Sequence, residues 1–182
     1  MRTLLKIASV AALALLATVG CQSRTDKTDS GGVLLSITRV SPMPYALVVN
    51  DSATWSIDEI VVQSIVTDPT GSTSQLMNVE LESYEVTYTR LDTGTRVPPV
   101  LVEYISGVVP VAGQFTLLNA PYVRLDQINN QPLRDLIQFG VDRETNSAVI
   151  RLRVGIRFFG RTLAGRNVES ATTFFTIDAF RG

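Results

Sequence analysis

The chain of 182 residues contains no histidine, one cysteine and one tryptophan. Without histidine, neither a Ser-His-Asp triad nor a Cys-His pair can form, and the commonest general base and metal ligand are missing. A single cysteine allows no internal disulfide and leaves too few ligands for a zinc site. We therefore expect no catalytic residue, no metal and no cofactor, and hence a protein that is not an enzyme.

Lysine is also scarce, because it occurs only at positions 6 and 27. The formal net charge is −1, yet the charges are unevenly distributed. Residues 51–103 hold nine acidic residues and two arginines, whereas residues 140–182 hold seven arginines and four acidic residues. These two regions either pair with each other or form a charged binding face. No basic-aromatic motif accompanies the arginines, and we expect no nucleic-acid partner.

The first 21 residues have the layout of a secretory signal peptide. Arg2 and Lys6 give a positively charged start, residues 7–19 are uncharged and rich in alanine and leucine, and the stretch ends at Cys21. This apolar run of 13 residues is shorter than the ~20 that a membrane-spanning helix needs. The stretch therefore predicts export rather than a membrane span.

The end of this stretch resembles the lipobox of bacterial lipoproteins, in which small residues precede one invariant cysteine. Gly20 and Cys21 match that pattern, whereas Thr18 replaces the usual leucine. The resemblance implies that residues 1–20 are a signal peptide and that Cys21 is lipidated. Gln22, rather than aspartate, follows the cysteine, which implies sorting to the outer membrane in a bacterium with two membranes.

Residues 21–32 then comprise the lipidated cysteine and a tether. The tether is polar, rich in small residues and without periodicity, which is typical of a flexible linker. About ten such residues have an average span of roughly 15–20 Å. We expect the domain at residues 33–182 to be held close to the surface of the membrane.

Alternating and apolar runs between turn signals predict strands throughout residues 33–182. The expected strands are 33–40, 45–49, 59–67, 78–90, 101–105, 114–118, 148–159 and 167–180. The run at 78–90 keeps its alternation only with one extra residue near Ser83, which predicts a β-bulge there. Two glycine-containing pairs, Ser106-Gly107 and Ala112-Gly113, are expected to separate strands, and residues 160–165 are expected to form a turn.

One helix is expected over residues 130–139, where apolar residues recur at i, i+3 and i+4. Asn130 or Gln131 can cap its start, and Gly140 is suited to end it. This helix would cross between two strands of the domain.

The many short strands predict an all-β fold, an antiparallel immunoglobulin-like β-sandwich of about seven to nine strands with one short crossover helix. The hairpin of residues 148–159 and 167–180 resembles the last two strands of immunoglobulin-like or fibronectin-type domains. The chain lacks the disulfide and the tryptophan that pack between the sheets of antibody domains.

A row of arginines lies on one face of the strand expected over residues 148–159. It consists of Arg151, Arg153 and Arg157. Three guanidinium groups in a row could bind a phosphate, an acidic glycan or lipid headgroups. Alternatively, they face the glutamates of residues 78–90 across an antiparallel strand pair. Each such pair of opposite charges would stabilise the sheet by roughly 0.2–1 kcal/mol. Those glutamates are Glu80, Glu82 and Glu85. The matched numbers favour pairing.

Trp55 is a second candidate, because an aromatic ring near a loop can stack on a sugar. A ring of this size more often fills a core or a sheet edge. The loops at 68–77 and 91–99 could carry a binding site. They contain neither a glycine-rich phosphate loop nor a nucleophile motif.

Three functions are compatible with these features. The favoured one is a non-enzymatic envelope lipoprotein, anchored in the membrane through Cys21, that acts as a structural or accessory protein-interaction module for another envelope protein. The alternative is a surface lipoprotein that binds a glycan or small ligand through Trp55 and the loops. A carboxylate-based hydrolase would need two acids about 5–10 Å apart in a cleft, and the sequence shows no sign of them.

Overall fold

The structure, a computed structural model, describes residues 32–50 and 54–182. Nine strands make up most of this part of the chain, because its alternating and β-branched runs suit a pleated sheet. The strands are β1 (Val33–Ser41), β2 (Ala46–Val49), β3 (Trp55–Val66), β4 (Val79–Arg90), β5 (Leu101–Val109), β6 (Gln114–Val123), β7 (Val149–Thr162), β8 (Asn167–Glu169) and β9 (Thr173–Arg181). The short helical elements are η1 (Gln75–Met77), α3 (Leu125–Ile128) and α4 (Leu133–Phe139).

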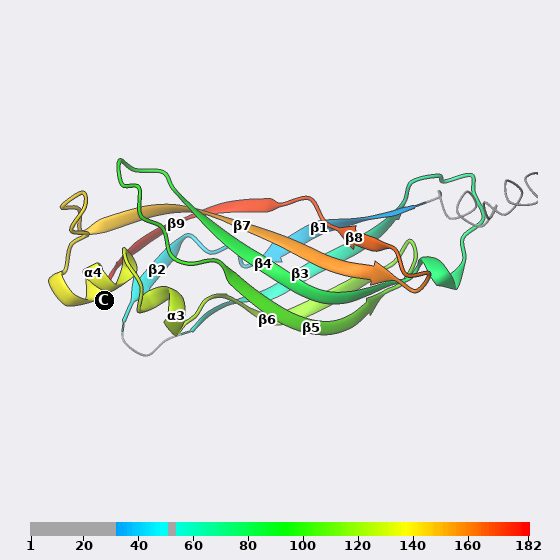
Figure 1. The fold of residues 1–182 in the computed structure, drawn as a ribbon, viewed down its shortest axis with the longest axis horizontal. Helices are drawn as coiled ribbons and strands as arrows, with labels where there is room; N and C mark the ends of the chain where they lie inside the picture. Colours follow the sequence, from blue (N-terminus) through cyan, green and yellow to red (C-terminus); the bar gives the residue numbers. More distant parts are fainter. Residues whose placement is uncertain (1–31, 51–53) are drawn as a thin grey trace, which may run out of the picture. The chain divides into compact units, whose positions relative to one another are not determined.

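The strands form two sheets that pack on each other (Figure 1). One sheet has the order β1-β3-β6, and the other has the order β2-β9-β7-β4-β5, with β8 beside β7. Of the ladders between described strands, only β2 and β9 run parallel. The predicted all-β sandwich of seven to nine strands is confirmed.

The strand order is that of an immunoglobulin-like sandwich. Strands β1, β3 and β6 occupy the places of A, B and E, and strands β4, β7 and β9 occupy those of C, F and G. Strand β5 is then an added C′ strand at the edge of the second sheet. The expected final hairpin is β7 and β9, which pair in antiparallel register.

The core lies between the sheets and is built by alternation along the strands. In β7, the residues Ile150, Leu152, Val154, Ile156 and Phe158 are all buried, as predicted for that face. Ala148, expected on the same face, is exposed and precedes the strand. Phe175 and Ile177 of β9 face inward, as expected.

The predicted β-bulge in β4 is confirmed. The register of β4 shifts between Leu81 and Ser83 against both of its neighbours, β5 and β7. Because of the extra residue, Leu81 and Tyr84 both reach the core although an odd number of positions separates them.

Two glycines that the sequence analysis placed in turns lie inside strands. Gly107 belongs to β5, where the ring of Phe115 occupies the space that a side chain would need. Gly160 belongs to β7, where a Cβ would overlap the backbone oxygen of Glu80. Both glycines are needed for a close approach of neighbouring groups, and the strands therefore continue through them.

The last predicted strand, 167–180, is divided into β8 and β9 at Ser170. The buried hydroxyl of Ser170 accepts a hydrogen bond from the Phe158 backbone nitrogen at 3.0 Å. The backbone nitrogen of Ser170 donates to the Phe158 oxygen at 2.9 Å. A side chain thus takes the place of a backbone partner, which interrupts the ladder.

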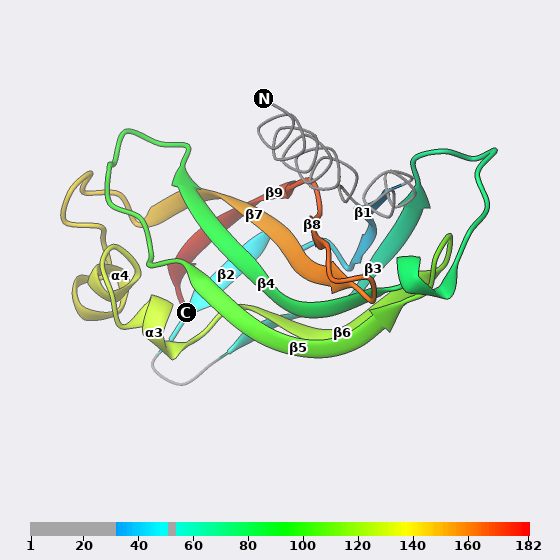
Figure 2. The same ribbon diagram turned by 45° about the vertical axis from the view of Figure 1, so that its right-hand side comes forward.

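The helical connection between β6 and β7 crosses from one sheet to the other, as predicted (Figure 2). Helix α4 begins at Leu133, later than expected, and Gly140 at φ 75° ends it. Neither expected cap is used, because Pro132 holds that position and the Asn130 amide donates to the Asp126 oxygen at 2.7 Å. Helix α3 was missed, since four residues are too few to show a period.

Candidate functional site

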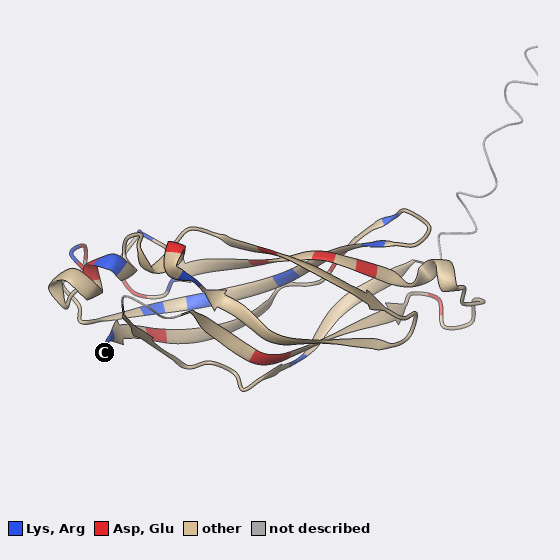
Figure 3. Ribbon diagram, turned by 90° about the horizontal axis from the view of Figure 1, so that it is seen from below, with Lys and Arg blue, Asp and Glu red and all other residues tan. Residues whose placement is uncertain are grey.

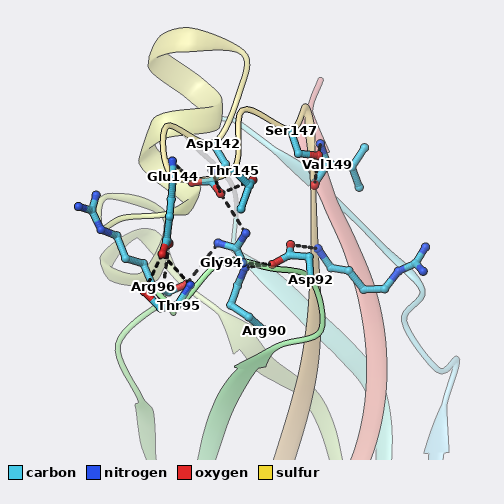
Figure 4. A network of polar contacts seen from close by, with 11 residues as sticks. Arg90, Asp92, Gly94, Thr95, Arg96, Asp142, Glu144, Thr145, Ser147 and Val149 are labelled. Atoms are coloured by element: carbon cyan, nitrogen blue, oxygen red, sulfur yellow. Dashed lines mark hydrogen bonds and ion pairs between the residues drawn. The ribbon is translucent and has the colours of Figure 1, made fainter.

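The candidate site lies at the end of the domain that carries α3 and α4 (Figures 1 and 2). The connection between β4 and β5, residues 91–100, meets the segment between α4 and β7, residues 140–148, at this end. In the order of an immunoglobulin-like domain, these are the C–C′ and E–F connections. A network of polar contacts joins them (Figure 4).

Arg90 is the centre of the network. It follows the buried positions Val86 and Tyr88 on the inward face of β4, and its side chain is only 3% exposed. Its Nη2 donates to Asp142 Oδ2 at 2.9 Å, and its Nε donates to Asp92 Oδ1 at 2.6 Å (Figure 4). A buried guanidinium is thereby paired with one carboxylate from each connection.

Asp142 also organises its own loop. Its carboxylate accepts hydrogen bonds from the Thr145 hydroxyl at 2.7 Å and from the Glu144 nitrogen at 3.2 Å. Its backbone nitrogen donates to the Ser147 oxygen at 2.8 Å. Because the Asp142 side chain is 1% exposed, these donors replace the water that the carboxylate loses.

The connection at 91–100 is held by carboxylates in turn. Glu144 accepts hydrogen bonds from the Thr95 nitrogen at 2.8 Å, the Thr95 hydroxyl at 2.6 Å and the Arg96 nitrogen at 3.0 Å. Asp92 accepts from the Gly94 nitrogen at 3.0 Å. A Cβ on Gly94 would overlap the Arg90 guanidinium, which explains why glycine is needed there.

The pKa values of the aspartates in the network are lowered, which favours their ionised form. Burial acts to raise the pKa of Asp142, but hydrogen bonds from Thr145 and Arg90 outweigh it and hold that pKa below its usual value. Burial acts in the same way on Asp92, and the hydrogen bond from Arg90 again leaves the pKa lowered. The network is thus a set of charged contacts at neutral pH, and it stabilises the geometry of this end.

A cavity of about 580 Å³ lies beside the network, between α4 and the connection at 91–100. Its basic lining residues are Arg96, Arg134 and Arg143, and its apolar ones are Val97, Pro99 and Phe139. Among the described residues that line it, Asp135 is the one acid and the most deeply buried charged group, at 2% exposure. Figure 3 shows basic and acidic residues gathered at the end that carries α4.

The arginine row predicted on β7 does not gather around a common point. Arg151 makes a bidentate ion pair with Asp178 of β9 at 2.8 and 3.1 Å. Arg153 lies over the ring of Phe174, 4.1 Å from its centroid. Arg157 lies 3.3 Å from Glu85. The expected partners of Arg151 and Arg153 were therefore wrong.

The glutamates on β4 do face β7, but in a different register. Glu85 is opposite Arg157, whereas Glu80 is opposite Arg161 and Glu82 lies in the bulge, 3.8 Å from Arg161. Of the three arginines in the row, only Arg157 contacts one of the three glutamates, Glu85. The bulge and the presence of Arg161, which the sequence analysis left out of the row, shift the others.

Trp55 is the first residue of β3 and pairs with Val123 of β6. Its side chain is half-buried and packs against the core. It does not line the cavity beside α4. This position agrees with a ring that fills the end of the sandwich and gives no support to sugar stacking.

The described residues contain no group of three or more acidic, cysteine or histidine side chains placed to hold a metal ion. Within the same part of the chain, no helix is long and apolar enough to cross a membrane. Cys21 and the rest of the expected leader lie outside the described residues.

Neither Arg90 nor Asp142 was predicted from the sequence, although one signal was present. Period-two alternation places Tyr84, Val86, Tyr88 and Arg90 on one face, and that face is buried. A charged residue on a buried face requires a counter-charge, so Arg90 could have been identified as half of an ion pair. Its partner, 52 positions further along the chain, could not be identified from this pattern.

No family model matches this chain, and comparison with the curated proteins and with the solved structures finds no significant similarity.

Proposed function

We propose that this protein is a non-enzymatic lipoprotein of the bacterial cell envelope, anchored in the outer membrane through Cys21, and that it serves as an accessory module that holds another envelope protein near the membrane. The layout of the first 21 residues supports the location. The observation that carries the interaction is the outward face of the edge strand β5.

Strand β5 ends its sheet and presents uncharged side chains outward. Val102 and Val108 are each 48% exposed, and Tyr104 is 86% exposed. Edge strands of soluble domains are commonly protected by lysine or proline because their backbone groups can pair with another chain. Residues 101–109 contain neither. The partner that fits is an extended segment with alternating apolar side chains, which would add a strand beside β5.

The β5 proposal predicts a specific crosslink. A photo-crosslinking amino acid in place of Tyr104 is expected to give one product with a second envelope protein in intact cells, identified by mass spectrometry. Val108→Lys should abolish that product, because a buried ammonium without a partner is costly. Leu163→Lys, at a residue that is 50% exposed outside β5, is the matched control and should leave the product unchanged. A product of two copies of this chain, or none, would contradict the proposal.

The anchor makes a separate prediction. The protein is expected to partition into a detergent phase and to carry acyl chains in its intact mass, because ~0.8 kcal/mol per buried methylene holds an acylated protein in a membrane. Cys21→Ser should move it to the aqueous phase, whereas Ser23→Ala should not. Retention of the Cys21→Ser variant in the detergent phase, after removal of residues 1–20, would refute the anchor.

A further inference from the structure

Three arginines at the cavity beside α4 have no carboxylate partner within the described part of the chain. Arg96 donates to the Gln131 side-chain oxygen at 2.7 Å, and Arg143 lies 5.0 Å from the centroid of the Phe139 ring. Arg134 Nε lies 2.9 Å from the Gln138 side-chain amide, which accepts its hydrogen bond when the amide is turned to present its oxygen. None of the three forms an ion pair with a described acid, whereas Arg90, Arg124, Arg151, Arg157 and Arg161 all do. Positive charge is thus concentrated at one cavity.

Asp135 is the second observation, and it is independent of the arginines. Its Oδ1 accepts a long hydrogen bond from Gln131 at 3.3 Å, and its buried Oδ2 has no hydrogen-bond partner among the described residues. A buried polar atom without a partner costs free energy, and such atoms are rare in folded proteins. Because Asp135 lines the cavity while Oδ2 itself is covered, a rotation of this carboxylate would let a donor on a bound molecule satisfy Oδ2.

The two features are held at a fixed separation. Gln131 bridges them, since its oxygen accepts from Arg96 and its nitrogen donates to Asp135. The backbone of Arg96 is in turn fixed by Glu144 of the polar network. The cavity volume of about 580 Å³ lies within the range of roughly 300–1,000 Å³ that is typical of small-molecule sites.

We propose that this cavity binds a small anionic polyol, of the class of acidic sugars and sugar phosphates. The anionic group would pair with Arg96, Arg134 and Arg143, because guanidinium groups bind carboxylates and phosphates through charge-assisted hydrogen bonds. A hydroxyl group would donate to Asp135 Oδ2, and Phe139 supplies an apolar surface for the sugar ring. The site is separate from β5, so the crosslink at position 104 and sugar binding can fail independently.

The test is calorimetric titration of the protein, without its leader, with four probes. Glucose 6-phosphate and glucuronate carry both groups, glucose lacks the anion, and inorganic sulfate lacks a donor. We expect both acidic sugars to bind at least about tenfold more tightly than glucose or sulfate, since one charge-assisted hydrogen bond contributes about a factor of ten or more. Sulfate or glucose binding as tightly as the acidic sugars would overturn the proposal, as would no binding of either acidic sugar.

Variants assign the binding to this cavity. Arg134→Gln should weaken the binding of glucose 6-phosphate by about tenfold. Asp135→Asn should weaken the binding of glucose 6-phosphate but leave the binding of sulfate unchanged or make it tighter. Loss of folding would weaken the binding of both probes and would not produce this difference. Arg153→Gln is the matched control, because Arg153 is also exposed without a described carboxylate partner but lies on β7. An equal loss of affinity for glucose 6-phosphate in Arg153→Gln would place the binding on the arginine row of β7 and would refute the cavity as the binding site.

Discussion

Replacement of Asp142 by alanine is expected to lower the free energy of unfolding by about 3–5 kcal/mol, because it leaves a buried guanidinium without its buried partner. Arg90 and Asp142 are 3% and 1% exposed in their side chains, so that solvent cannot take over the lost contact. The change also removes the acceptor of the Thr145 hydroxyl. Equilibrium unfolding in urea at neutral pH measures the loss.

An exposed ion pair of similar geometry provides the control. Asp178 pairs with Arg151 in bidentate fashion, but these side chains are 37% and 59% exposed. Asp178→Ala should therefore cost far less than Asp142→Ala. The double variant Arg90→Met, Asp142→Ala should be less destabilised than the sum of its single changes, because neither charge is left buried alone. Equal losses at positions 142 and 178 would show that the buried pair of Arg90 and Asp142 contributes no more than an exposed ion pair.

Asp142→Ala should also change how the free energy of unfolding depends on pH. The folded-state pKa of Asp142 is lowered, so its contribution is present above the ordinary aspartate pKa of about 4 and is lost as the pH falls through the lower folded value. Wild-type protein should thus lose stability on acidification from pH 5 toward pH 2. Asp142→Ala should lose less over that interval, and thermal unfolding at several pH values measures the difference.

The fold was largely predictable from local pattern. Alternation along residues 148–159 identified the buried face of β7, and a slip in alternation located the bulge near Ser83. Both signals are local, because side chains of a strand alternate between its two faces whatever the neighbouring strand is. Glycine was the misleading signal: Gly107 is required by the ring of Phe115 on the next strand and Gly160 by the backbone of the distant Glu80, whereas the sequence around both glycines is typical of a turn.

The candidate site was less predictable, because it depends on contacts between distant segments. The pairing of β4 with β7 was expected, but the bulge moves Glu82 from the expected arginines toward Arg161. The cavity residues Arg96, Asp135 and Arg143 come from three segments that carry no motif. Only the crossing of the chain between β6 and β7 brings them together, so their common location could be found only from the structure.

Phe158→Ala is expected to lower the free energy of unfolding by about 3–5 kcal/mol, the usual cost of removing a large ring from a packed core. Phe158 is fully buried, and its ring centroid lies 5.4 Å from that of Tyr84. Loss of the ring leaves a cavity between the two sheets that the rigid strands cannot close. Urea unfolding of the two proteins measures the difference.

The adjacent Phe159 is the matched control, because it is the same residue type on the opposite face of β7. Its ring is only half-buried and lies under the guanidinium of Arg157, 4.8 Å from its centroid. Phe159→Ala should lower the free energy of unfolding by less than half as much as Phe158→Ala, because folding removes less apolar surface from water at position 159. Equal costs would mean that both faces of the larger sheet are packed. A partner would then cover the face that carries the arginines, and the polar row on β7 would have to be interpreted as an interface.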